Sequence, residues 1–340
     1  MTRGELRGSA VVIAEIGVNH NGSLDLAKEL VSCAAEAGAD YAKFQTFRAE
    51  NLATSAAPVA NYQKVSFPGE RQVDLLASLE LSEENFTELV AYCREQGIGF
   101  LTTAHDLASA PFVFGLNSDF IKVPSGDVTN FPFLRAVGRQ HQPVLLSTGA
   151  SRGDEVLMAI EVLESQGLSR GQITVMQCTT QYPAPIEEAN LRAMVAMGQQ
   201  WGVGIGYSDH TLGQDSALAA VALGATVLEK HITLDRTMEG PDHAASLEPD
   251  EFARMVEAVR VVGLSLGHEE KEVTRAELQN RDVIRKSIVA IQPIAVGELL
   301  TEENLGVMRP GTGISPMKWV DVVGQPARRS YEAHDLIELS

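Results

Sequence analysis

The chain has 340 residues, of which 44% are hydrophobic and 21% are charged, and its formal net charge is −18. These values are typical of a globular protein with more than one domain, and the charge excludes a general nucleic-acid-binding surface, because no basic run offsets phosphate repulsion. Three cysteines without a CxxC pair exclude a complete disulfide framework, and no apolar run reaches the length of a membrane span, so we expect a soluble cytoplasmic protein without a membrane partner.

Short apolar runs alternate with amphipathic helical stretches through the first 267 residues. Eight of these runs are predicted strands: VVIAEIGVN (11–19), YAKFQTF (41–47), GFLTTAHD (99–106), FIKVPSGD (120–127), PVLLSTGA (143–150), ITVMQCTT (173–180), VGIGYSD (203–209) and TVLEKHIT (226–233). Their apolar character is mostly unalternated, as expected for parallel strands covered on both faces. Eight consecutive βα units, without a dinucleotide-binding fingerprint at the first turn, predict an α/β fold: a closed (β/α)8 TIM barrel over residues 1–267.

Two regions interrupt this rhythm. Residues 48–80 form a long excursion after the second strand, and a loop of that length is expected to cover a site or to become ordered on binding. After residue 267 the composition becomes polar, which predicts a linker over 268–284. Residues 285–340 contain short β-like runs broken by Gly and Pro, and they predict a small β-rich second domain.

Polar residues stand at the carboxyl end of each predicted strand, the end that carries the active site in a barrel of this kind. In chain order they are Glu15, Lys43, Gln45, Thr102, Thr103, Lys122, Ser125, Ser147, Thr179, Thr180, Tyr182, Asp209, His210, Glu229 and His231. One buried lysine is often only an ion-paired side chain, but eight strands that are polar at the same end indicate an active site.

Two histidines follow successive strands at matching positions, in GYSDHTLG and EKHITLD. On adjacent strands His210 and His231 would lie at the same height, so their imidazoles can converge on one divalent cation. Two histidines with oxygen ligands suit Mn²⁺, Mg²⁺, Co²⁺ or Zn²⁺. Further candidates for holding the ion or its bound water are Glu229, Asp209, Asp242 and His243.

Strands two to five supply two cations and three hydroxyl groups, on Lys43, Lys122, Thr103, Ser125 and Ser147. This combination suits a phosphate or a phosphoenol carboxylate held opposite the metal. A lysine pair inside the barrel mouth would also allow an acidic protein to bind an anion.

Nine motifs occur in order along nearly the whole chain: AEIGVNHNG, KFQT, KVPSGD, LLSTGAS, CTTQYPAP, GYSDHTLG, EKHITLDR, GPDHAASLEP and RPGTGISP. Together they resemble the sialic acid synthase family, whose members condense phosphoenolpyruvate with an N-acetylated hexosamine. The resemblance implies a TIM barrel joined to a small C-terminal SAF, or antifreeze-like, domain. It also implies a domain-swapped homodimer in which each C-terminal domain caps the partner's barrel.

The resemblance assigns roles to residues of these motifs. Contacts to phosphoenolpyruvate fall on Lys43, Thr103, Lys122, Ser125, Ser147, Thr180, Tyr182 and Ser208. Metal ligands fall on His210 and His231, with Mn²⁺ expected first and Mg²⁺ or Co²⁺ as alternatives. Sugar contacts fall on Glu15, Gln45, Asp242 and, from the partner chain, Arg309, and catalytic roles fall on Glu15, Glu229, His210 and His231. Some relatives have Asn where this chain has Thr180, so a hydroxyl would replace one amide contact to the phosphate.

The resemblance implies a phosphoenolpyruvate-dependent transferase of the N-acetylneuraminate synthase type. Phosphoenolpyruvate, N-acetylmannosamine and water would give a nine-carbon 2-keto acid and phosphate by C–O cleavage. The alternative sugars are N-acetylmannosamine 6-phosphate and the 2,4-diacetamido-2,4,6-trideoxyhexoses that yield legionaminate or pseudaminate. A metal-dependent aldolase or a 3-deoxy-sugar acid synthase would explain the barrel but not the C-terminal domain. A carbohydrate- or ice-binding protein would not explain the paired lysines and histidines.

Overall fold

The computed structural model describes residues 10–52, 54 and 71–339. The chain divides into two compact units, Met1–Gly267 and His268–Ser340.

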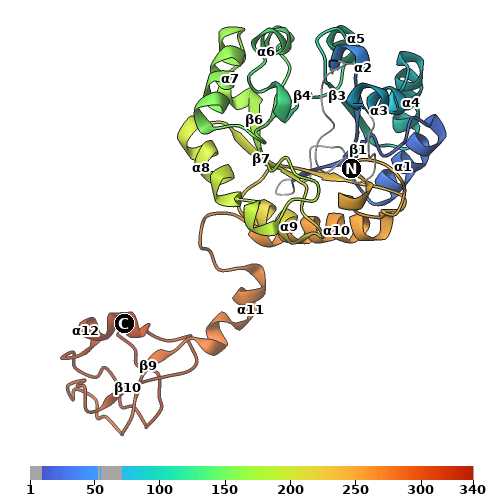
Figure 1. The fold of residues 1–340 in the computed structure, drawn as a ribbon. Coiled ribbons are helices and arrows are strands. Elements are labelled where there is room, and N and C mark those ends of the chain that lie inside the picture. The colour runs from blue at the N-terminus through green and yellow to red at the C-terminus, as the bar shows by residue number, and fades with distance from the viewer. Residues whose placement is uncertain (1–9, 53, 55–70, 340) are drawn as a thin grey trace. The chain divides into compact units, whose positions relative to one another are not determined.

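The first unit is built on eight parallel strands with helices around them (Figure 1). The strands are β1 (Val11–Gly17), β2 (Tyr41–Thr46), β3 (Gly99–Ala104), β4 (Ile121–Val123), β5 (Val144–Ser147), β6 (Ile173–Cys178), β7 (Gly204–Asp209) and β8 (Val227–His231). Their order in the sheet is β3-β2-β1-β8-β7-β6-β5-β4, so the first and last strands of the chain pair directly. Strands β3 and β4, at the two ends of this order, lie in contact. The predicted TIM-like barrel is confirmed.

Amphipathic helices cover the outside of the strands. They are α1 (Leu24–Glu36), α2 (Ala49–Leu52), α3 (Gln72–Leu79), α4 (Glu83–Glu95), α5 (Ala110–Gly115), α6 (Phe131–Gly138), α7 (Gly153–Ser165), α8 (Leu191–Trp201), α9 (Asp215–Ala222) and α10 (Pro249–Leu266). Helix α4 shows why they form: Ser82 caps its first turn by accepting from the Asn85 amide, and Phe86, Leu89 and Cys93 are buried along one face. The described part of the predicted 48–80 excursion contains α2 and α3, and residues 53 and 55–70 lie outside the described residues.

The barrel interior changes from apolar to polar along the strands. One apolar cluster inside the barrel is made of Ile13, Tyr41, Leu101, Leu145, Met176 and Val227. Because side chains alternate along a strand, the same face is reached again two residues later. Those positions hold Glu15, Lys43, Thr103, Ser147, Cys178 and Glu229. The alternation of the strands therefore places a ring of functional groups directly above an apolar floor.

The second unit is a small β-rich domain with its own core. Strands β9 (Ser287–Ala290) and β10 (Leu305–Met308) pair antiparallel, and a short helix, α12 (Trp319–Val322), follows them. Their core consists of Ile288, Ala290, Ile294, Leu300, Leu305, Val322, Ala327, Tyr331 and Ile337. Part of the segment predicted as a polar linker is helical: α11 (Arg275–Ile284) begins with a Thr274 capping box and has no buried residue.

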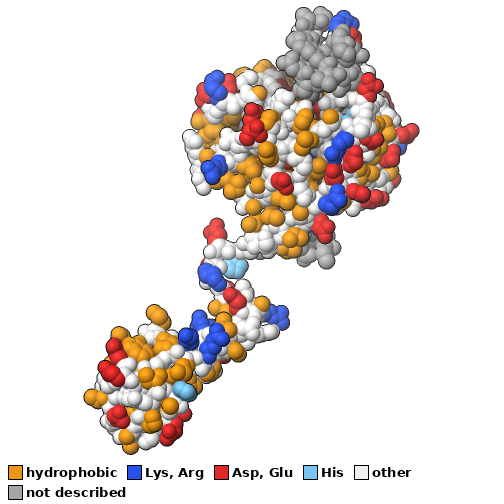
Figure 2. Space-filling model, turned by 60° about the horizontal axis from the view of Figure 1, so that its bottom comes forward, with side chains coloured by type: hydrophobic (Ala, Val, Ile, Leu, Met, Phe, Trp, Pro, Cys, Tyr) orange, Lys and Arg blue, Asp and Glu red, His pale blue; other side chains and the backbone are white. Residues whose placement is uncertain are grey.

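None of the helices in the described residues is both long and apolar enough to cross a bilayer. Figure 2 shows acidic and basic side chains scattered over one face, with apolar side chains between them.

Candidate active site

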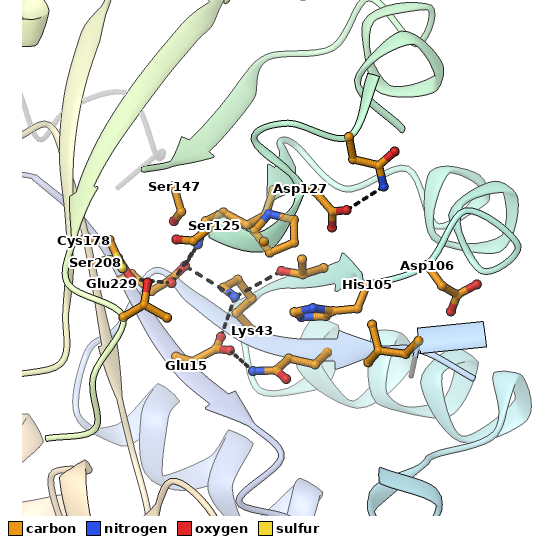
Figure 3. A pocket seen from close by; sticks show the side chains of 18 of the residues that line it. Glu15, Lys43, His105, Asp106, Ser125, Asp127, Ser147, Cys178, Ser208 and Glu229 are labelled. Carbon is orange, nitrogen blue, oxygen red and sulfur yellow. Dashed lines mark hydrogen bonds and ion pairs between the residues drawn. The ribbon is translucent and has the colours of Figure 1, made fainter. Parts of the chain in front are cut away.

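A cavity of about 580 Å³ opens at the carboxyl ends of the strands, which is a suitable size for a small-molecule site (Figure 3). Most of the predicted site residues line it: Glu15, Lys43, Gln45, Thr103, Lys122, Ser125, Ser147, Thr180, Tyr182, Ser208, His210, Glu229 and His231. Three other strand-end candidates, Thr102, Thr179 and Asp209, are not among the lining residues, since they bond to Thr46, Glu188 and Lys230 respectively. Arg309 belongs to the second unit, where it is exposed and donates to the Ile284 carbonyl.

Four charged side chains form a buried cluster in the cavity wall. The Lys122 Nζ lies 2.8 Å from both carboxylate oxygens of Glu229. The Lys43 Nζ lies 2.7 Å from Glu15 Oε2 and 3.5 Å from Glu229 Oε2. All four side chains are at most 5% exposed. We call Glu15, Lys43, Lys122 and Glu229 the inward cluster.

The inward cluster differs from the sequence-based expectation of two lysines available to an anion. Unpaired charges are costly to bury, and the two carboxylates remove that cost when the cavity holds no anion. An anionic substrate would therefore bind these lysines by replacing carboxylate contacts. Lys43 also donates to the Thr103 hydroxyl at 3.2 Å, and Ser208 donates to Glu229 at 2.9 Å, so neutral hydroxyl groups are present at the same point.

The two carboxyl groups of the inward cluster differ in proton affinity. Burial raises the pKa of Glu15, and the attraction of Lys43 only partly offsets it. Burial acts in the same direction on Glu229, but Lys122 and Lys43 together hold its pKa below the ordinary value. Glu15 is therefore the carboxyl group of this pair that takes up a proton more readily.

The His210 and His231 rings lie close together, with centroids 5.4 Å apart, and the Tyr182 ring lies 4.0 Å from that of His210. The His210 Nδ1 donates to the Thr179 carbonyl at 2.8 Å, which leaves the Nε2 lone pair available to a ligand. Burial lowers the pKa of His231 well below its ordinary value, so this imidazole is neutral at pH 7.

The donor set around the histidines fits a divalent cation. The buried His231 Nδ1 has no hydrogen-bond partner within the described residues and lies 4.0 Å from Asp242 Oδ2. Since the described residues contain no ready-made group of three or more His, Cys, Asp or Glu ligands, an ion held here would take further ligands from substrate or water.

Three further candidates for the cation site have other partners. Asp209 pairs with Lys230 at 2.8 Å, Glu229 pairs with Lys122, and His243 shares a 2.6 Å hydrogen bond with Thr233.

Ser125 and Thr180 present their hydroxyl groups next to Gly149, at the position that a side chain there would occupy. The Gly149 amide donates to Ser125 Oγ at 3.0 Å, and a Cβ at Gly149 would clash with the Thr180 hydroxyl. A side chain at 149 would therefore displace these hydroxyl groups, so the position requires glycine.

Among the lining residues that the sequence reasoning missed, two stand at inward-facing positions of the strands. His105 lies on the same side of its strand as Thr103, and burial with the nearby lysines lowers its pKa to about 3, so it is neutral. The Cys178 Sγ lies 3.8 Å from His210 Nδ1. Both follow an inward position by two residues, so strict strand alternation would have found them.

Comparison with known proteins identifies the family. A family model described as the NeuB family matches residues 30–271, and the SAF domain model matches residues 285–340. The chain belongs to the NeuB family. The predicted sialic acid synthase resemblance and the predicted TIM barrel with an SAF domain are thereby confirmed.

Relatives of this NeuB-family chain are named as synthases of several different acids. It is 42% identical over 328 residues to the N,N'-diacetyllegionaminic acid synthase of Campylobacter jejuni, a match that covers 96% of this chain and 98% of that one. It is 36% identical over 328 residues to the N-acetylneuraminate-9-phosphate synthase of Homo sapiens, covering 96% and 90%. The crystal structure of the N-acetylneuraminic acid synthetase of Leptospira borgpetersenii, in complex with citrate, has a TM-score of 0.71 and 29% identity and covers 82% of this chain and 94% of that one.

Proposed function

We propose that this protein condenses phosphoenolpyruvate with an N-acetylated hexosamine derivative and water to give a nine-carbon 2-keto acid and phosphate. The observation that supports this most is the arrangement of one cavity, in which the inward cluster lies beside the His210–His231 pair. Such a wall offers cations and hydroxyl groups for a phosphorylated carboxylic acid and imidazoles for a cation that activates a carbonyl.

The sugar we propose is a 2,4-diacetamido-2,4,6-trideoxyhexose, with a legionaminate-type acid as product. The motifs alone predict N-acetylmannosamine, with this sugar among the alternatives. The higher identity to the legionaminic acid synthase, 42% against 36% for the human N-acetylneuraminate-9-phosphate synthase over equal lengths, supports the reverse order.

The proposed substrate contacts follow the geometry of the cavity. Lys43 and Lys122 would bind the anionic groups of phosphoenolpyruvate, assisted by the hydroxyl groups of Thr103, Ser125, Ser147, Thr180 and Ser208. Tyr182 would also contact phosphoenolpyruvate. The proposed sugar contacts are Glu15, Gln45 and Asp242, whose carboxylate lies 4.0 Å from His231. A Mn²⁺ ion at His210 and His231, or Mg²⁺ or Co²⁺ in its place, would supply Lewis-acid polarisation of the open-chain sugar's aldehyde.

The proposed reaction forms one C–C bond and breaks one C–O bond. C3 of phosphoenolpyruvate attacks the aldehyde carbon, and the aldehyde oxygen takes a proton. Water then adds at the electron-poor C2 and loses a proton, which gives a hemiketal phosphate. The C2 hydroxyl of this intermediate passes its proton to the departing phosphate as the bond between C2 and the phosphate oxygen breaks and the C2 keto group forms. Glu15 accepts from Gln45 at 3.1 Å and has a raised pKa, so it suits the delivery of the proton.

A substrate panel tests this proposal. Purified protein with Mn²⁺ and phosphoenolpyruvate is given the diacetamido-trideoxyhexose, N-acetylmannosamine or its 6-phosphate, and released phosphate and product mass are measured. We expect sugar-dependent phosphate release, fastest with the diacetamido sugar, and oxygen from isotope-labelled water in the keto acid rather than in the phosphate. Release that is independent of every sugar would contradict the proposal.

We also propose a homodimer in which Arg309 of one chain contacts the sugar in the partner's barrel. Mixing inactive Arg309→Ala chains with inactive His231→Ala chains should then restore some turnover, because one hybrid site holds both intact residues. A mixture that stays inactive after confirmed subunit exchange would contradict the swapped arrangement only.

A further inference from the structure

Strands β7 and β8 present three successive side-chain pairs on alternating faces. Ser208 and Glu229 are register partners and hydrogen bond inside the barrel. Asp209 and Lys230 are the next partners in register, and their side chains form an ion pair on the other face. His210 and His231 follow, and their rings meet inside the cavity.

Asp209 and Lys230, which we call the outward pair, are the last residues of β7 and β8 that pair in register. The register of β7 with β8 ends at Asp209 and Lys230, so no further strand pairing holds the two histidines at a fixed separation. The Lys230 Nζ and Asp209 Oδ2 lie 2.8 Å apart, and both side chains are 0% exposed. Because no water reaches this ion pair, its two side chains have few other positions available. The pair therefore links β7 to β8 at the point where their backbone hydrogen bonds end.

Lys230 also fixes the residue on the other side of His210. Its ammonium group donates to the Thr211 carbonyl as well as to Asp209. Asp209 Oδ1 in turn accepts from the Thr211 amide at 2.9 Å and from the Thr211 hydroxyl at 2.8 Å. Both chain neighbours of His210 are therefore bonded to Lys230, the residue that directly precedes His231.

The network extends to the outer helix. Ser216, in α9, donates to Asp209 Oδ2 at 3.0 Å and hydrogen bonds to the Thr211 hydroxyl at 2.6 Å. The carboxylate of Asp209 therefore has bonds to a strand, a loop and a helix, which restrict its position further.

We propose that Asp209 and Lys230 are positioning residues that hold the imidazoles of His210 and His231 at the separation required to share one divalent cation. The cation itself rests on the proposed function. The pair touches neither the cation nor the substrate and acts only through the backbone on which the two histidines stand.

The test measures Mn²⁺ affinity of the full chain, from the electron paramagnetic resonance signal of free Mn²⁺ during a titration. Asp209→Asn/Lys230→Met removes both charges together, so no unpaired buried charge remains. We expect the Kd for Mn²⁺ to rise about tenfold or more, the scale seen when groups that orient metal ligands are removed. The Kd for phosphoenolpyruvate without added metal, measured by calorimetry, should stay at the wild-type value, because neither Asp209 nor Lys230 lines the cavity.

A partly exposed ion pair on the same barrel serves as the control. Arg260 and Asp40 form a 2.7 Å ion pair between α10 and the residue before β2, and neither lines the cavity. Asp40→Asn/Arg260→Met should leave the Mn²⁺ affinity unchanged. Equal loss of Mn²⁺ affinity in both double variants, or no loss in Asp209→Asn/Lys230→Met, would overturn the positioning role.

If the double variant does not fold, a milder variant tests the positioning role. Thr211→Val keeps both charges and removes only the hydroxyl that donates to Asp209, and we expect a smaller weakening of Mn²⁺ binding. Wild-type affinity in folded Thr211→Val would then overturn the proposal. Wild-type protein that binds Mn²⁺ but forms no keto acid would count against the proposed function and leave the positioning role standing.

Discussion

Two buried lysine–carboxylate systems lie on opposite faces of the same barrel wall. The inward cluster of Lys43, Lys122, Glu15 and Glu229 lines the cavity, while Lys230 and Asp209 pair on the outer face next to α9. In both systems each buried charge has a partner of opposite sign, because an unpaired charge buried in a barrel would cost several kcal/mol. The two systems differ in whether a ligand can replace one of the paired groups.

The outward pair is saturated and closed to ligands. Asp209 accepts from Lys230, Ser216 and the amide and hydroxyl of Thr211, and its side chain has no exposed surface. In the inward cluster, Lys43 lies between two carboxylates at 2.7 and 3.5 Å and borders a cavity. The same residue types therefore serve stability where their bonds are complete, and under the proposed function they would bind substrate where an entering anion can replace a partner.

The largest effect should come from breaking the outward pair on one side. Lys230→Met leaves Asp209 buried without its counter-charge, and we expect the free energy of unfolding to fall by ~3–5 kcal/mol. Lys122→Met should cost less, because Glu229 retains Lys43 and Ser208. Urea unfolding in a Trp319→Phe background, where Trp201 alone reports on the barrel, measures both. Equal losses would remove the distinction between the two systems.

Removal of the cation should have the next largest effect, on turnover rather than on stability. Chelation, or His210→Ala/His231→Ala, should lower kcat at least ~100-fold, because Lewis-acid polarisation supplies several kcal/mol. Mn²⁺ should restore the chelated wild type but not the double variant. Full turnover by the metal-stripped double variant would exclude a cation at these histidines.

Shortening one inward lysine should weaken binding of a single substrate. Lys122→Ala removes a charge-assisted contact worth ~1.5–3 kcal/mol, which raises the KM for phosphoenolpyruvate roughly 10- to 100-fold. The KM for the sugar should hardly change. Steady-state kinetics with each substrate varied in turn shows the difference, and an unchanged KM for phosphoenolpyruvate would contradict the assigned role of Lys122.

A smaller effect is expected at a buried group outside both systems. Burial lowers the pKa of His20 to about 4, and its Nδ1 accepts from the Gly22 amide at 3.0 Å. The unfolded chain protonates this histidine below about pH 6.5 while the folded chain keeps it neutral, so stability falls as the pH drops toward 4. By pH 5 we expect a loss of ~1–2 kcal/mol. Urea unfolding at pH 7.5 and pH 5 should show a smaller loss in His20→Gln, and equal losses would contradict this assignment.

The sequence predicted the fold well because its signals are local. Each of the eight barrel strands lies within its predicted run, since parallel strands buried on both faces are continuously apolar. The predicted ends ran too far at β4, which stops at Val123 because Pro124 precedes a short 3-10 turn, Ser125–Asp127. The polar residues at the strand ends also predicted most of the residues that line the cavity.

The sequence could not predict which charges pair. Lys122 and Glu229 are 107 positions apart, and their contact depends on the closure of the barrel. The orientation of Asp209, in contrast, could have been inferred: it lies between the inward positions Ser208 and His210, so alternation turns it outward. The alternation of side chains along a strand thus distinguishes the proposed cation ligand His210 from its neighbour Asp209.

The pairing of the inward cluster has a consequence for the order and cooperativity of binding. Its two ammonium groups and two carboxylates sum to zero charge, so an anionic substrate brings an excess of negative charge into a buried space. Uptake of a proton or of a cation at the neighbouring imidazoles would compensate that excess. Binding of phosphoenolpyruvate and binding of the cation are then thermodynamically linked. Each ligand lowers the dissociation constant of the other by the same factor.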